Sequence, residues 1–296
     1  ELAALPHLTL IVDAASVYTP ARIDDDVDVL VGGGQVLALL SRRDDAALLE
    51  RLRGVARHVV SAAGMVLCPG LVDIHVHLTG GGGELGPESR TREATVPELV
   101  AAGLTTVVGV LGTDDVSRSL ECLLAKVQAV RRRGLTAYMY TGSYACPPRT
   151  LTRSVRQDVA LVAEVIGVGE VAVSDHRGSF PTTAELRQLI ADVVRGGLLK
   201  GFGGVLYAHV GRGKSCLQPL RDALADTGMP LTACVPTHCH RHARLIADAV
   251  AWMRDGGYAD FTAPSPLTVR TVAALCNNKY RAFIARDHDE LDAAAA

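Results

Sequence analysis

The sequence predicts an α/β fold in which a small N-terminal β-layer precedes a parallel (β/α)8 barrel. Two observations predict the barrel. From Leu71 onward, short apolar runs alternate with helix-like stretches. Eight of these runs are strand candidates, as many as a (β/α)8 barrel requires. The length of 296 residues also accommodates such a barrel. A doubly wound open sheet is the alternative that the same alternation allows.

The first 65 residues differ from the rest of the chain. They hold short β-rich runs separated by Gly and Asp turns: LTLIVDAASVY, DVDVLVGGGQVLALL and ARHVVSAAGMVLCPG. We therefore predict two domains, a small β-sandwich-like layer over 1–65 and the barrel over 66–296.

The predicted barrel strands and helices alternate along the chain. The strand candidates are 71–77, 104–112, 136–144, 169–175, 204–210, 231–238, 258–263 and 281–287. The helix candidates are 92–103, 117–134, 154–166, 182–197, 215–227, 240–256 and 266–277. Several of these helices end at Gly, as helix C-termini prefer. A GxxxxGK[ST] loop is absent from the sequence, and GGGE is not GxGxxG, so nucleotide binding has little support.

Charge and cysteine content exclude several classes of protein. Thirty basic and 32 acidic residues give a net charge of −2, without a basic stripe for nucleic acid or a membrane surface. Apolar runs stay shorter than the ~18 residues of a transmembrane helix. Seven cysteines without a CxxC pair indicate reduced thiols rather than a disulfide framework. We therefore expect a cytoplasmic protein that binds neither nucleic acid nor membrane.

Histidines and carboxylates stand at the predicted strand ends, where barrel enzymes build their active sites. They are His75 and His77 on strand one, Glu170 on strand four, His209 on strand five, His238 on strand six and Asp287 on strand eight. Because side chains alternate along a strand, His75 and His77 point to one face. This nitrogen and oxygen ligand set predicts two divalent ions, zinc by preference, which can share a hydroxide nucleophile. Taken singly, each histidine also has a structural explanation, as a hydrogen-bonded or exposed side chain.

The segment PGLVDIHVHLTGGGGELGP resembles the first barrel strand of the amidohydrolase superfamily, and within it the isoaspartyl (β-aspartyl) dipeptidases. The similarity continues through GLTTVVGVLGTD, TGSYACPPRT, VIGVGEVAVSDHRG, VPTHCHRH and DGGYADFTA. The resemblance implies that His75 and His77 hold one metal, and that His209 and His238 hold the second. Glu170 would bridge the two, at the position where the best-known members have a carboxylated lysine.

The resemblance also implies a substrate site. Glu84 in GGGGE would bind the free α-amino group, and Thr113 in LGTD would lie along the substrate. Tyr144 in GSY would donate to the developing oxyanion. Arg177 in SDHR and Arg241 in HCHR would clamp carboxylates. Without the resemblance, these side chains could equally be solvated loop and rim residues.

The sequence departs from the family near its C-terminal end. Asp287 is the position-matched candidate for the acid–base aspartate of strand eight and for a metal ligand. However, Ala285 and Arg286 replace the family's small residues before it, and Asp289 and Asp292 are nearby alternatives. The C-terminal strands that complete the β-layer in the family are missing, so we expect a homo-oligomer or a partner chain to cover its edges.

Together these observations predict metal-dependent hydrolysis of the isopeptide bond of small β-aspartyl dipeptides by a metal-bound hydroxide. Asp287 and Tyr144 are the predicted catalytic residues. Two alternatives stay open. One is another cyclic amidase or deaminase, and the other is a non-catalytic relative that serves as a structural or regulatory subunit.

Overall fold

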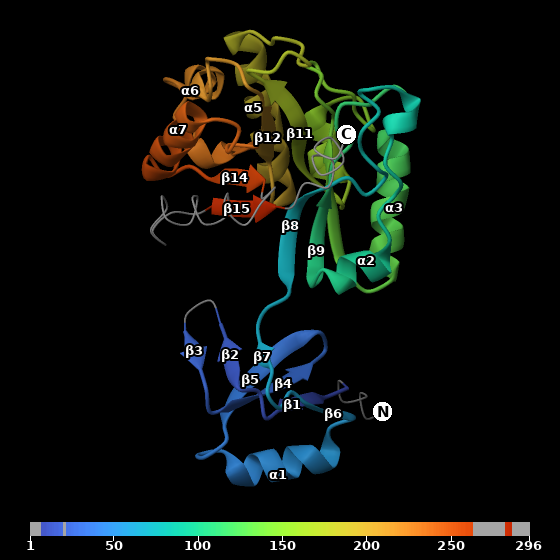
Figure 1. The fold of residues 1–296 in the computed structure, drawn as a ribbon, viewed down its shortest axis with the longest axis vertical. Coiled ribbons are helices and arrows are strands. Elements are labelled where there is room, and N and C mark those ends of the chain that lie inside the picture. The colour runs from blue at the N-terminus through green and yellow to red at the C-terminus, as the bar shows by residue number, and fades with distance from the viewer. Residues whose placement is uncertain (1–6, 20–21, 263–281, 286–296) are drawn as a thin grey trace. The chain divides into compact units, whose positions relative to one another are not determined.

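The computed structural model describes residues 7–19, 22–262 and the strand at 282–285 (Figure 1). The contacts of the chain divide it into two compact units, Glu1–Gly70 and Leu71–Ala296. Each unit is described by itself below. Within the described residues, all helices are too short or too polar to cross a membrane.

The N-terminal unit is built from two small sheets. One has the order β5–β4–β1–β6 and the other the order β3–β2–β7. The strands are β1 (Thr9–Val12), β2 (Ser16–Tyr18), β3 (Ile23–Asp24), β4 (Val27–Gly32), β5 (Gln35–Ser41), β6 (His58–Ser61) and β7 (Val66–Leu67). Helix α1 (Ala46–Val55), which the sequence analysis did not predict, packs Leu49 against Leu10, Val12 and Leu40. The β-rich prediction for this part of the chain is therefore confirmed, with one helix added.

Eight strands are described in the C-terminal unit, seven of them at the predicted places. They are β8 (Leu71–Val76), β9 (Leu104–Gly109), β10 (Thr136–Thr141), β11 (Val165–Val173), β12 (Val205–Val210), β13 (Cys234–Thr237), β14 (Ala259–Thr262) and β15 (Ala282–Ala285). Strands β8 to β13 form one parallel sheet in sequence order, and β14 pairs in parallel with β15. Because β14 lies beside β13 and β15 lies beside β8, the strands form a ring. A doubly wound sheet would reverse its strand order, so the barrel prediction is confirmed.

Six helices follow the strands at predicted positions. They are α2 (Val96–Ala101), α3 (Leu120–Arg132), α4 (Val155–Leu161), α5 (Thr183–Lys200), α6 (Gln218–Leu224) and α7 (Ala243–Arg254). The capping boxes Thr95/Glu98 and Thr182/Glu185 fix the starts of α2 and α5. The helix predicted over 266–277 lies outside the described residues.

The prediction for the fourth strand was wrong in its position. The strand runs over Val165–Val173 rather than 169–175, so the helix predicted to continue to residue 166 ends at Leu161. Gly167 and Gly169 interrupt the apolar pattern of this strand and obscure its first half. Glu170 therefore lies inside the strand and not at its beginning.

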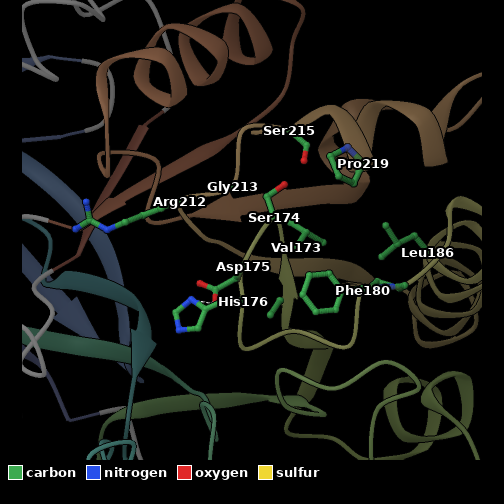
Figure 2. A pocket seen from close by; sticks show the side chains of 12 residues that line it. Val173, Ser174, Asp175, His176, Phe180, Leu186, Arg212, Gly213, Ser215 and Pro219 are labelled. Carbon is green, nitrogen blue, oxygen red and sulfur yellow. Dashed lines mark ion pairs between the residues drawn. The ribbon is translucent and has the colours of Figure 1, made fainter.

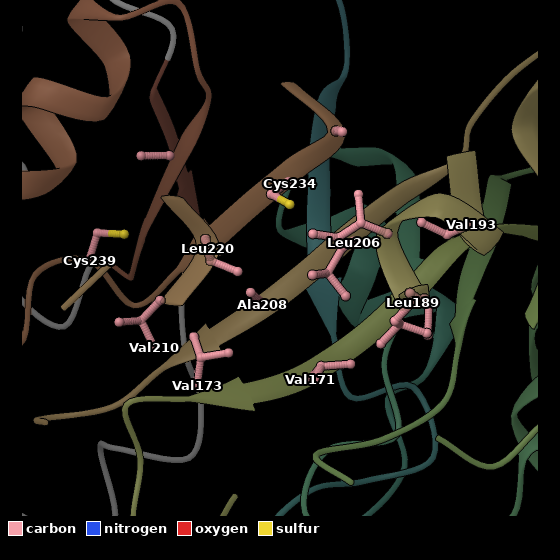
Figure 3. Close-up of a cluster of buried hydrophobic side chains, with 14 of the residues drawn as sticks. Val171, Val173, Leu189, Val193, Leu206, Ala208, Val210, Leu220, Cys234 and Cys239 are labelled. Carbon is pink, nitrogen blue, oxygen red and sulfur yellow. The ribbon is translucent and has the colours of Figure 1, made fainter. Parts of the chain in front are cut away.

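Alternate residues of the strands face two different cores. On β12, Leu206, Ala208 and Val210 pack against the helices in the main apolar cluster, which Figure 3 shows from close by. Tyr207 lies between them on the other face, in the barrel interior with Tyr140. The two tyrosine rings stack at 4.7 Å between centroids inside the barrel. His209 shares this face of β12, so the strand register turns it into the barrel.

Candidate active site

A bulge in β11 turns Glu170 into the barrel. Between Val168 and Val171, β11 contains one residue more than the paired segment of β12. Both valines face the helices, while Glu170 faces the interior and is completely buried. A side chain at Gly169 would place its Cβ 2.6 Å from the carbonyl oxygen of Tyr207. Glycine is therefore required beside Glu170 because the neighbouring strand comes so close.

The two carboxylate oxygens of Glu170 face two different pairs of histidines. Oε1 lies 3.3 Å from Nε2 of His75 and 4.0 Å from Nε2 of His77. Oε2 lies 3.0 Å from Nδ1 of His209 and 3.5 Å from Nε2 of His238. The ligand atoms of each pair and of Glu170 all lie within 4.8 Å of one another. Glu170 thus belongs to two potential metal-binding groups at once.

His209 and His238 are held by partners on the side away from Glu170. Nε2 of His209 lies 3.2 Å from Oδ2 of Asp175, and Nδ1 of His238 lies 2.6 Å from the Thr262 hydroxyl. His238 follows β13 directly and has a φ of 60°, a conformation that non-glycine residues adopt uncommonly. In each ring one nitrogen is engaged and the other faces the shared carboxylate, as in metal-ligating histidines.

The protonation of this cluster suits a cation. Burial alone would raise the pKa of Glu170, but the charge of His75 and hydrogen bonds with His209 and His238 hold that pKa well below its usual value. Burial lowers the pKa of His238 well below 6.5, so this imidazole is neutral at pH 7. Among the described residues, the buried Oε1 of Glu170 makes no hydrogen bond, and Nε2 of His75 lies 3.3 Å from it. A negative carboxylate beside imidazole nitrogens is a donor set that zinc prefers.

Arg177 connects the cluster to the surrounding loops. Its Nη1 donates to both carboxylate oxygens of Glu84, at 2.9 and 2.7 Å. Its Nε and Nη2 donate to the two oxygens of Asp175, at 3.0 and 2.9 Å. Nη2 also lies 2.9 Å from Nε2 of His209, and the guanidinium stands over the ring of Tyr144 at 5.3 Å. The Arg177 guanidinium therefore links the carboxylates of Glu84 and Asp175 to the histidine cluster.

Hydrogen bonds from Arg118 and Thr113 hold the glycine loop that carries Glu84. Arg118, which is almost fully buried, donates to the carbonyl oxygens of Gly81 and Gly82 at 2.6 and 3.2 Å. The Thr113 hydroxyl donates to Glu84 at 2.5 Å. Although partial burial opposes it, the hydrogen bonds from Thr113 and Arg177 hold the pKa of Glu84 below its usual value. Glu84 is thus a fixed negative charge at the rim of the site.

Tyr144 and Arg241 complete the surroundings of His209. The ring centroid of Tyr144 lies 4.3 Å from that of His209. Burial and the charge of Glu170 raise the pKa of Tyr144 well above 10, so its hydroxyl keeps its proton and can donate it in a hydrogen bond. Nη2 of Arg241 lies 3.3 Å from Nε2 of His209, while its Nε donates to the carbonyl oxygen of Val210 at 2.9 Å.

A cavity of about 490 Å³ adjoins the cluster between the loops that follow β11 and β12. Figure 2 shows Phe180, Leu186 and Pro219 along one side, with Asp175 and His176 on the other. Asp175 lines this cavity and also contacts His209. The cavity therefore adjoins the histidine cluster but does not enclose it.

Comparison with known proteins decides the family. The β-aspartyl dipeptidase of Fervidobacterium islandicum AW-1, a solved structure, is 37% identical, with a TM-score of 0.87 over 95% of this chain and 76% of that chain. The chain belongs to the β-aspartyl dipeptidase family. The same Fervidobacterium enzyme, solved in complex with β-Asp-Leu dipeptide, is 36% identical with a TM-score of 0.86, covering 96% of this chain and 74% of that one. No family model matches the sequence.

A curated relative has a different name. A dihydroorotase of Geobacter sulfurreducens is 28% identical over 282 residues, which are 90% of this chain. The chain spans 56% of the length of that relative. The resemblance to the amidohydrolase superfamily and to β-aspartyl dipeptidases, inferred from the motifs, is confirmed by the Fervidobacterium structures.

The β-aspartyl dipeptidase fold brings together the residues that the sequence pointed out. The predicted ligands His75, His77, Glu170, His209 and His238 form one cluster. The predicted substrate residues Glu84, Thr113, Tyr144, Arg177 and Arg241 surround the His209 side of it. Their roles stay predictions. Asp287 lies outside the described residues, as do its alternatives Asp289 and Asp292.

Sequence reasoning missed the residues that hydrogen-bond to the predicted histidine ligands or to the partners of those histidines. They are Asp175, Tyr207, Thr237, Asp260 and Thr262. Asp260 carried a readable signal, since a carboxylate within the predicted buried strand YADFTA needs a partner. The hydroxyls of Tyr207, Thr237 and Thr262 carried no such signal, because tyrosine and threonine are common in strands.

Proposed function

We propose that the chain is a metal-dependent hydrolase that cleaves the isopeptide bond of β-aspartyl dipeptides. The observation that carries the proposal is the division of the Glu170 carboxylate between two histidine pairs. This arrangement stands in a chain that is 37% identical to a β-aspartyl dipeptidase. The charged residues around His209 support the choice of substrate.

The cluster would hold two divalent ions, with zinc as the proposed metal. His75 and His77 would hold one, His209 and His238 the other, and Glu170 both. The buried Glu170 Oε1, which makes no hydrogen bond with the part of the chain that the structure describes, fits this assignment. When bound, such ions supply a Lewis acid and a water of lowered pKa. Asp287 remains the proposed additional ligand and acid–base residue on sequence grounds alone.

The pairing of Glu84 with Arg177 would favour substrates with an isoaspartyl linkage. A β-aspartyl residue carries its ammonium and its free carboxylate on the same carbon, so the two charges are adjacent. Glu84 and Arg177 present an anion and a cation at 2.7 Å from each other. A bound substrate would exchange this ion pair for two new ones, ammonium to Glu84 and carboxylate to Arg177. An α-linked peptide has its α-carboxyl in the amide and offers no such pair.

Tyr144 and Arg241 would act on the scissile bond and on the leaving residue. Because its pKa is raised, Tyr144 stays protonated and can donate to the amide oxygen as negative charge develops there. Arg241 would bind the carboxylate of the leaving amino acid. Asp287 would accept the proton from the attacking water and pass it to the leaving amine.

Hydrolysis of a matched pair of dipeptides tests the proposal. The zinc-loaded full chain is incubated with β-Asp-Leu and with α-Asp-Leu, and free leucine is measured. Cleavage of the β-linked peptide, with the α-linked peptide cleaved at least ~100-fold more slowly, is expected from the loss of one charged contact. Equal cleavage of both would contradict the role of the Glu84–Arg177 pair.

The second candidate is hydrolysis of a cyclic amide, which the similarity to a protein named dihydroorotase favours. Dihydroorotate is therefore the third substrate in the same assay. Ring opening of dihydroorotate without dipeptide cleavage would support this second activity. Bound zinc with no turnover of any of the three would support the remaining alternative, a non-catalytic relative.

A further inference from the structure

Asp260 is a buried carboxylate that none of the roles above requires. It lies in β14 and is completely buried. Its Oδ2 accepts hydrogen bonds from the hydroxyls of Tyr207 and, at 2.6 Å, of Thr237. Its Oδ1 makes no hydrogen bond with the described residues. Burying such a group costs free energy, so its retention among apolar strands calls for a reason.

Both hydroxyls lead to the first predicted metal ligand. Nδ1 of His75 lies 3.0 Å from the Tyr207 hydroxyl and 3.4 Å from the Thr237 hydroxyl. A hydroxyl has one proton to donate, and each of these donates it to Asp260. The oxygens that face His75 can then only accept. Nδ1 of His75 must therefore carry a proton. In the neutral ring the lone pair is then on Nε2, the nitrogen 3.3 Å from Glu170 Oε1.

We propose that Asp260 is a positioning residue that acts through Tyr207 and Thr237 to fix the tautomer and orientation of His75 for metal binding. It contacts neither metal ligand atoms nor substrate itself. The inference rests on the proposed function only in taking the histidine cluster as a metal site. Its chemistry is that of a carboxylate behind a ligating histidine, transmitted here through two hydroxyl groups.

The assignment does not depend on the charge of Asp260. Burial raises its pKa. The assignment requires only that Oδ2 accepts from both hydroxyls, which holds for the carboxylate and for a carboxyl protonated on Oδ1. In either state Oδ2 orients both hydroxyls the same way.

Tyr207 is itself held in place, so it can serve as a rigid link. Its ring is completely buried and stacks on Tyr140, with 9° between the ring planes. The hydroxyl therefore cannot move away from His75 without disturbing the packing of Tyr207 on Tyr140. The other two buried histidines differ from His75, because Asp175 and Thr262 contact His209 and His238 directly.

Two variants and two controls test the proposal in the full chain. Asp260→Leu removes the acceptor, so the hydroxyls are free to donate to His75 Nδ1 and drive the proton to Nε2. Tyr207→Phe removes the main link and keeps the ring. Asp260→Asn retains an acceptor oxygen and should rescue. Asp158→Asn is the matched control, since Asp158 is equally buried but bonds to Thr141, Leu151 and Thr152.

Neither readout requires turnover. Long-range ¹H–¹⁵N spectra of the metal-free, histidine-labelled chain show which nitrogen of His75 carries the proton, with the signal assigned by its loss in His75→Gln. Zinc affinity is measured by competition with a chelator. We expect the Nδ1–H tautomer in the wild type, the Nε2–H tautomer in Asp260→Leu, and zinc binding weakened about 10- to 100-fold in Asp260→Leu and Tyr207→Phe. Asp260→Asn should stay within about threefold of the wild type, and Asp158→Asn should bind as the wild type does.

The opposite results would overturn the proposal. They are an Nε2–H tautomer in the wild type, or unchanged zinc affinity in folded Tyr207→Phe. If Asp260→Leu does not fold, Tyr207→Phe and the wild-type tautomer still decide. A wild type that carries the expected tautomer and binds zinc but cleaves no dipeptide would leave this inference standing and contradict the proposed function instead.

Discussion

The Glu170 carboxylate and the His209 imidazole lie 3.0 Å apart, Oε2 to Nδ1, although 39 positions separate them in the sequence. The other carboxylate oxygen faces His75 and His77. One side chain thus holds the two halves of the candidate metal centre together. The account of the site depends on this arrangement, and the first prediction concerns it.

Replacing Glu170 with Gln should remove the shared charge while keeping the shape of the side chain. Bound zinc is expected to fall from about two ions per chain to one or fewer, and dipeptide hydrolysis to fall by about 10³-fold or more. Metal is counted by atomic emission on the same samples that are assayed. Glu164→Gln is the control, because Glu164 precedes the same strand but pairs with Arg131 at 3.3 Å. Two zinc ions in a Glu170→Gln chain would contradict the shared-ligand role.

Replacing Glu84 with Gln should weaken substrate binding more than chemistry. The ammonium of the substrate would lose its charged partner, so KM for β-Asp-Leu is expected to rise about 10- to 100-fold while zinc content stays unchanged. The control is Glu88→Gln in the same loop, an exposed residue that should leave KM within about twofold of the wild type. A fall in kcat with an unchanged KM would place Glu84 in the chemical step instead.

The Glu84–Arg177 ion pair should give a small, pH-dependent stability. The folded-state pKa of Glu84 is lowered from 4.5, so its contribution is present above pH 4.5 and is lost as the pH falls through the lower folded-state value. Because Glu84 is partly exposed, the contribution should be about 1 kcal/mol or less. Urea unfolding of the wild type and of Glu84→Gln should therefore differ at pH 7 and converge in acid. A difference that grows in acid would have the wrong sign for this pair.

Placing a methyl group at Gly169 should disturb the site by pushing β11 away from Tyr207 on the neighbouring strand. Its Cβ would lie 2.6 Å from the Tyr207 carbonyl oxygen and 2.7 Å from the Tyr207 Cβ. We expect Gly169→Ala to cost about 1–3 kcal/mol in unfolding free energy and to weaken zinc binding, because Glu170 and Tyr207 must shift. Gly54→Ala is the matched control, since no atom lies within 4 Å of its added Cβ in α1. That control should be neutral or slightly stabilising by helix propensity. Equal melting temperatures for the two variants would show that β11 accommodates the methyl group.

Much of the barrel could be predicted because strands such as β11, β12 and β13 are buried on both faces. Such strands form short apolar runs, and seven of the eight described strands lie where the runs predict them. The prediction was wrong in position for β11 (Val165–Val173), where glycines interrupt the run and a bulge shifts the alternation. A bulge is fixed by the fit to the neighbouring strands, and the sequence of one strand does not show it.

The ligands of the candidate site could be predicted from the sequence, but the hydrogen bonds and ion pairs that connect its residues could not. The histidines stood out because they occupy strand ends, and the family motifs indicated Glu84 and Arg177. The ion pair between those two, 93 positions apart, could not be foreseen because each had been assigned to the substrate. The Asp260–Tyr207–His75 chain depends on which strands meet inside the ring. Contacts across a barrel interior follow from closure of the ring rather than from local pattern.

The most direct test is a zinc titration of the metal-free chain in which bound zinc and β-Asp-Leu hydrolysis are measured in the same samples. The account predicts that zinc binding saturates at about two ions per chain and that hydrolysis rises with the second equivalent. Hydrolysis that is complete at one ion, or absent when two are bound, would contradict the claim that Glu170 joins two metals into one hydrolytic site.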